Sequence, residues 1–103
     1  MARRELLSGF TAVPGTARRV RTVRLHPGAT RAVAACAAGE RLISGWHAIA
    51  FDTSKPPTAA LIRSVSATRS IRGNSVVVQA KAGGAVQAVR ALLQVGAVCG
   101  GGS

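Results

Sequence analysis

The chain has 103 residues, a formal net charge of +11 and only two cysteines. This length corresponds to one domain with a modest hydrophobic core. The sequence contains no apolar run of about 18 residues, so we expect no transmembrane helix. Twenty Ala and twelve Val stand against three aromatic residues, so the core has to be built from small and β-branched side chains.

Residues 1–17 are expected to form an extended N-terminal arm, because the SGF and VPGT segments interrupt the single helical turn that the first residues could form. Three apolar residues of this arm, Leu6, Leu7 and Phe10, are candidate anchors on a neighbouring subunit. The segment has a basic pair but no continuous apolar stretch, so we do not expect it to act as a signal peptide.

Six segments that favour extended backbone follow the arm. They are Arg18–Leu25, Thr30–Ala37, Arg41–Phe51, Ala60–Ser70, Ser75–Ala82 and Val86–Cys99. Turn residues separate them about every 10–14 residues, a spacing typical of antiparallel sheets. We therefore expect an all-β fold of about six antiparallel strands in a small sandwich or barrel. Residues 18–99 would form this single domain, and residues 100–103 a Gly-rich tail.

Two of these segments need a further interpretation. Neither face of Arg41–Phe51 is strongly polar, so we expect this strand to be buried on both sides, with Gly45 allowing a neighbouring group to approach closely. The segment Val86–Cys99 fits a helical period as well as a strand, and Ala and Leu favour helix. The unbroken alternation from Val89 to Cys99 leads us to favour the strand.

Cys36 and Cys99 lie on segments that should be neighbours, and we expect a disulfide between them. It would close a loop of about 64 residues and stabilise the domain by about 4 kcal/mol. The alternative is a pair of buried free thiols. Two distant cysteines and two histidines do not form a metal-ligand motif, so no metal site is expected.

Catalytic chemistry is not expected from this chain, and no cofactor is implied. The only acidic residues are Glu5, Glu40 and Asp52, too few for paired-carboxylate hydrolysis. His26 lies in a turn, and His47 lies within an apolar strand, where we expect a core or interface histidine. No Ser/His/Asp or Cys/His arrangement can be argued from the spacing.

The run Arg18–Arg24 is the best candidate for binding a partner. Strand alternation places Arg19 and Arg21 on one face and Arg18 and Arg24 on the other. Nucleic-acid surfaces usually add aromatic residues for stacking, and none lies nearby. We therefore expect these arginines to contact an acidic protein surface, and we expect neither nucleic acid nor membrane as the partner.

The residues around the cysteines resemble a known group of proteins. The stretch CAAGERLISGWHAIAF, the Ser-rich segment at Ser66, the hairpin residues Gly73-Asn74-Ser75 and the terminal Ala97-Val98-Cys99 are similar to small cysteine-bracketed β-domains. Such domains occur in actinobacterial secreted proteins and in virion proteins of phages that infect those hosts. The resemblance covers roughly residues 30–99 and implies a disulfide-stapled β-domain without catalytic residues.

Together these observations predict a non-enzymatic structural protein of a bacteriophage virion, either a capsid decoration (cement) protein or a small tail component. The absence of a signal peptide favours the virion over secretion. Partners would be capsid or tail subunits with an acidic surface, bound by a homo-oligomer or by repeated copies of the chain. The main alternative is a secreted or surface binding module, lectin-like in character. A second alternative is a basic nucleic-acid-binding protein.

Overall fold

A computed structural model describes residues 16–101 of the chain. Its strands are β1 (Thr16–Arg24), β2 (Gly28–Ala35), β3 (Arg41–Asp52), β4 (Val65–Arg72), β5 (Ser75–Ala82) and β6 (Arg90–Gly100). A short helix, α2 (Ala59–Arg63), precedes β4, and a 3-10 turn, η1 (Gly84–Ala88), precedes β6. Neither is long and apolar enough to cross a membrane.

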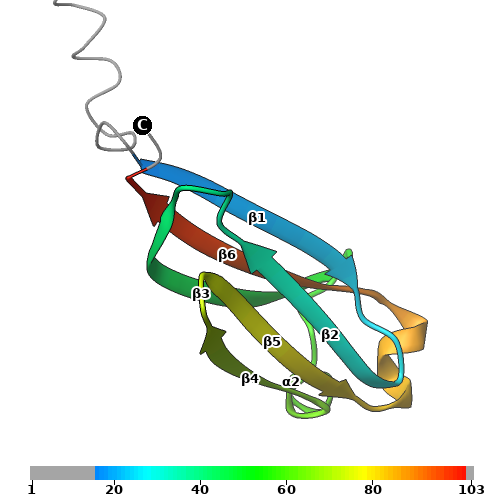
Figure 1. Cartoon of the computed structure of the whole chain (residues 1–103). Coiled ribbons are helices and arrows are strands. Elements are labelled where there is room, and N and C mark those ends of the chain that lie inside the picture. Colours follow the sequence, from blue (N-terminus) through cyan, green and yellow to red (C-terminus); the bar gives the residue numbers. More distant parts are fainter. Residues whose placement is uncertain (1–15, 102–103) are drawn as a thin grey trace, which may run out of the picture.

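The strands form two three-stranded antiparallel sheets. Sheet A has the order β1-β6-β3 and sheet B the order β2-β5-β4. Figure 1 shows β6 between β1 and β3, with sheet B as the second layer. The expected all-β fold of six antiparallel strands is therefore confirmed. Of the two architectures considered, the described residues form a sandwich and not a closed barrel.

The core lies between the two central strands. The inward side chains of β6, which are Ala91, Leu93, Val95, Ala97 and Cys99, are fully buried. They face the inward side chains of β5, which are Val76, Val78 and Ala80, each at most 1% exposed. These thin side chains suit aligned packing of two sheets, because the facing rows can interdigitate closely.

The segment Ala60–Ser70 differs from the expected single strand. Its first residues belong to α2, and the strand begins only at Val65. Thr58 caps the helix, since its Oγ1 accepts a hydrogen bond from the Leu61 N–H at 3.1 Å. Ala and Leu favour helix, and one turn is enough to bury Leu61. Leu61 and Ile62 are adjacent apolar residues, and a stretch this short fits the period of a helix as well as that of a strand.

The ends of the domain also differ in detail from the prediction. Residues 90–99 form a strand as expected, but Gly84–Ala88 form a 3-10 turn that buries Val86. β1 begins at Thr16, so two residues assigned to the arm belong to the sheet. β6 likewise includes Gly100 from the expected tail. The rest of the arm, residues 1–15, lies outside the described residues.

β3 is not buried on both sides as expected. The register with β6 shifts between Leu42 and Ser44, so Ile43 bulges outward and is 60% exposed. Leu42 then shares the inward face with Gly45, and the outward Ala48 is exposed. The close approach expected at Gly45 is confirmed, because a Cβ atom there would lie 2.5 Å from Cγ2 of Val76 on the other sheet.

The predicted disulfide between Cys36 and Cys99 is present, with a Cα–Cα distance of 5.7 Å. Cys36 directly follows β2 at the edge of sheet B, and Cys99 lies on the central strand of sheet A. The bridge therefore links the two sheets covalently, across 63 positions of sequence. Cys99 is fully buried, while Cys36 is half-buried.

Removing this bridge is expected to destabilise the domain strongly. The double substitution Cys36→Ala and Cys99→Ala should lower the free energy of unfolding by about 4 kcal/mol, because the unfolded chain regains the entropy of a long open loop. Urea unfolding followed by circular dichroism measures the difference. Intact mass with and without a reductant provides the control, and identical masses would contradict the bridge.

Candidate protein-binding surface

The seven candidate partner-binding residues fall into two groups. Leu6, Leu7 and Phe10 lie outside the described residues. The four arginines all lie on β1, an edge strand of sheet A that pairs with β6 along one side only. Their register with β6 places Arg18 and Arg24 on the outer face of the sheet, and Arg19 and Arg21 on the side of sheet B.

Arg19 is held within its own chain. Its Nη2 lies 2.6 Å from Oε2 of Glu40, and its Nε donates to Oε1 at 3.4 Å. The same carboxylate accepts the Ala37 N–H at 2.7 Å. The hydrogen bonds from Arg19 and then from Ala37 lower the pKa of Glu40. Arg19 therefore fixes the β2–β3 connection, and it is less free than Arg18 or Arg24 to meet a partner.

Asn74 organises the same end of the sandwich. It follows Gly73, whose φ of +59° begins the tight β4–β5 hairpin turn predicted from Gly73-Asn74. Its side chain accepts the Leu42 N–H at 3.1 Å and donates to the Glu40 carbonyl at 2.9 Å. Its own carbonyl accepts the Cys36 N–H at 3.0 Å. The sequence indicated Asn74 as a turn residue, but its role in holding a second loop was missed.

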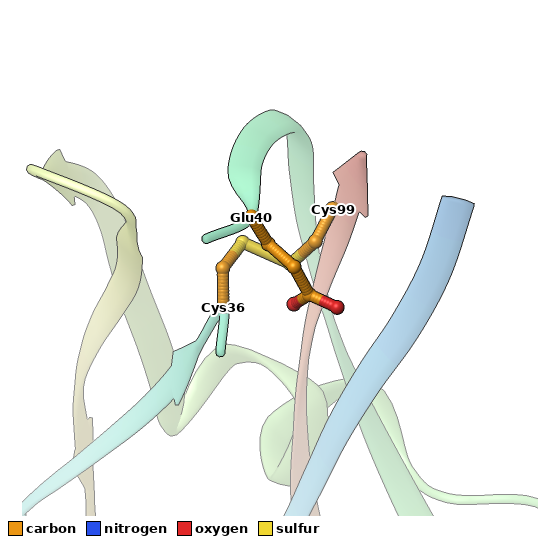
Figure 2. Close-up of side chains that lie close together, drawn as sticks. All are labelled: Cys36, Glu40 and Cys99. Carbon is orange, nitrogen blue, oxygen red and sulfur yellow. A yellow bond between two sulfur atoms is a disulfide. The ribbon is translucent and has the colours of Figure 1, made fainter. Parts of the chain in front are cut away.

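The residues Cys36, Glu40 and Cys99 bring three potential metal-ligating side chains within 4.8 Å of one another. Figure 2 shows the Glu40 carboxylate beside the disulfide. Because the two sulfur atoms are bonded to each other, this cluster offers no thiolate, and the carboxylate is already occupied by Arg19 and Ala37. We therefore assign the cluster a structural role.

His47 lies on the inward side of β3, half-buried, opposite Arg69 of β4. Its Nδ1 is 2.7 Å from Nη1 of Arg69. A guanidinium group has only donors, so Nδ1 of His47 is the acceptor in this contact. The contact joins the open edges of the two sheets. His26 is exposed in the β1–β2 turn, as expected for a polar turn residue.

The outer face of sheet A contains the largest aromatic side chain of the protein. The indole of Trp46 lies across Gly96 on the neighbouring strand, because a Cβ atom at Gly96 would overlap the indole ring. On the other side of Gly96 the register places Val20, which is 52% exposed. Along β6, the half-buried Val98 adjoins Gly96 on one side of this face, and Gln94, which donates to the Thr22 hydroxyl at 3.4 Å, separates Gly96 from the half-buried Leu92 on the other. We call Val20, Trp46, Leu92, Gly96 and Val98 the tryptophan face.

Positive charge borders the tryptophan face. Arg18 lies opposite Val98, and Arg24 lies opposite Leu92, so one arginine stands near each end of the apolar row. The only described carboxylate on this side of the sheet is that of Asp52, which lies opposite Arg90 at the end of β3. The face therefore combines an apolar centre with a positive edge, and no other described element covers it.

Comparison with protein-family models, with curated sequences and with solved structures gives no match for this chain. The candidate surface therefore rests on its own geometry.

The packing of Trp46 on Gly96 can be tested with the chain's single tryptophan. Gly96→Ala should displace the indole, shift its fluorescence emission to longer wavelength and increase quenching by acrylamide. Gly84→Ala is the matched control, since a Cβ atom there meets nothing within 4 Å and the emission should stay unchanged. Unchanged emission in Gly96→Ala would contradict the described position of the ring.

We expect Glu40 to make the stability of the folded chain depend on pH. Its pKa is lowered in the folded state, so its contribution is present above the unfolded-state pKa and is lost as pH falls through the folded-state value. We expect the thermal midpoint of the wild type to fall on acidification. Glu40→Gln should be less stable at neutral pH and should lose less stability in acid. Asp52→Asn, at the far end of β3, makes the same charge change away from Arg19 and serves as the control. An acid profile of Glu40→Gln identical to that of the wild type would contradict the argument.

Proposed function

We propose that the chain is a non-enzymatic structural protein of a virion, a capsid decoration protein or a small tail component, that binds an acidic protein surface through the tryptophan face. The observation that carries this proposal is the partly exposed apolar surface around Trp46, with an arginine near each end. Aromatic and arginine side chains contribute most often to binding energy at protein interfaces, and Arg grips carboxylates in a bidentate way.

Charge indicates which partner the tryptophan face fits. Two copies of the chain docked face to face would bring Arg18 and Arg24 of both copies together, and Asp52 would be the only described carboxylate on that side of sheet A to compensate. Like charges across an interface are unfavourable. An acidic partner removes this conflict, and it also matches the overall charge of +11.

The polar groups that catalysis would require are engaged elsewhere. Glu40 accepts hydrogen bonds from Arg19 and Ala37, and His47 accepts one from Arg69. The described carboxylates therefore stand apart, each beside an arginine. This arrangement supports a binding role over a catalytic one.

The location can be tested with an antibody raised against the folded chain. We expect the antibody to detect the chain in density-purified particles of a phage that carries the gene for it. Detection only as free protein in the culture medium would contradict the virion proposal and support the secreted, lectin-like module.

The binding surface can be tested with particles from which the gene has been deleted. Arg18→Glu with Arg24→Glu should weaken cosedimentation about tenfold, because each exposed ion pair contributes up to about 1 kcal/mol and charge reversal adds repulsion. Arg31→Glu with Arg72→Glu is the matched control, since it makes the same charge change on the outer face of sheet B. This control should bind nearly as the wild type does.

Two results would contradict the tryptophan face as the contact. An equal loss in both double variants would indicate net charge as the cause, without a specific surface. Tight and strongly salt-dependent binding to plain duplex DNA, lost in the Arg18/Arg24 variant, would favour the nucleic-acid-binding alternative.

A further inference from the structure

The outer face of sheet B carries a hollow of about 510 Å³. Its polar lining comes from two adjacent strands: Ser66, Thr68 and Ser70 of β4, and Gln79 and Lys81 of β5. Ala29 of β2 borders the hollow on the other side of β5. The hollow is separate from the tryptophan face, because the two lie on opposite outer faces of the sandwich.

The cross-strand register explains why the surface is hollowed there. Ser66 lies opposite Lys81, and Thr68 lies opposite Gln79, so the short side chains of β4 stand beside long ones of β5. Ala29 lies opposite Lys81 on the β2 side and is short as well. A long polar side chain with short neighbours on both flanks leaves open space above β4.

The lining supplies hydrogen-bond donors and positive charge. Ser66, Thr68 and Ser70 repeat every second residue, so their hydroxyls stand about 6.6–6.8 Å apart along the strand. The Gln79 amide and the Lys81 ammonium add further donors. Arg31 extends this positive side, because it lies opposite Gln79 on β2. None of the residues that line the hollow carries a carboxylate.

These donors are free in the described part of the chain. Within residues 16–101, the side chains of Ser66, Thr68, Ser70, Gln79 and Lys81 make no hydrogen bond or ion pair with one another or with other residues. Five unused polar side chains around one hollow are available to a ligand with many acceptors. Oxyanions are such ligands, since each oxygen accepts more than one hydrogen bond.

We propose that this hollow binds an oxyanion, the sulfate or phosphate group of an ester. The volume is within the range of small-ligand sites. A neutral sugar would need an aromatic platform, but of the two aromatic side chains in residues 16–101, Trp46 lies on the opposite face and Phe51 faces the core. Binding therefore depends on the ester group and on the hydroxyl row. This inference stands independently of the proposed function, because it concerns the other sheet.

The test uses isothermal calorimetry with three probes: a sulfated oligosaccharide, a phosphorylated one and their neutral parent. Binding to either charged probe and not to the neutral parent is the expected result, and the better of the two identifies the ester. Failure of both charged probes to bind would overturn the proposal, as would equal binding of all three.

Matched variants separate a built site from the general attraction of a basic protein. Ser66→Ala with Thr68→Val leaves the charge unchanged and should weaken binding about tenfold or more, since hydrogen bonds to charged groups are lost. Its control is Thr22→Val with Ser44→Ala on the outer face of sheet A, which should change binding less than about twofold.

The two lysines of the chain give a second matched pair. Lys81→Gln should weaken binding of the charged probe several-fold. Lys55→Gln, in the loop after β3, makes the same charge change away from the hollow and should have little effect. If both lysine variants lose affinity equally and the hydroxyl variant loses none, the attraction is one of net charge and the proposed site is wrong.

Discussion

The covalent link between Cys36 and Cys99 is the constraint on which the rest of this small sandwich depends. Each sheet has only three strands, and the facing rows consist mostly of Ala and Val, so apolar burial alone gives a domain of this size little stability. The bridge joins the two sheets at one end. Asn74 and Glu40 then hold the β2–β3 connection and the β4–β5 turn around the bridge through hydrogen bonds to backbone groups.

This anchored end accounts for the position of Arg19. Glu40 belongs to the loop that the disulfide restrains, so its carboxylate meets β1 at a defined place and engages Arg19. Because side chains alternate along β1, its arginines have different roles on the two faces of the strand. The inward Arg19 stabilises the fold, and the outward Arg18 and Arg24 stay beside the tryptophan face. A run of four arginines that looks uniform in sequence has different roles on its two faces.

Most of the fold could be predicted from the sequence, because turn residues and the alternation of apolar and polar residues are local signals. The strand Ser75–Ala82 and the hairpin at Gly73-Asn74 were predicted with their bounds, and the disulfide followed from the two cysteines. The surfaces could not be predicted in the same way. The contact of Trp46 with Gly96 depends on the register between β3 and β6, and the bulge at Ile43 shifts that register at one end of the strand. The hollow beside Thr68 likewise needs the pairing of β4 with β5.

A two-layered sandwich without covering helices leaves the outer face of each sheet to solvent or to partners, and here the two faces differ in chemistry. Sheet A presents an apolar row with arginines, which suits a protein surface whose carboxylates it can pair with. Sheet B presents hydroxyls, an amide and an ammonium group around a hollow, which suits a small charged group. The two surfaces lie on opposite outer faces of the sandwich, so a ligand on one face does not obstruct the other. The proposed protein partner and the proposed oxyanion would therefore occupy separate surfaces of the same small domain.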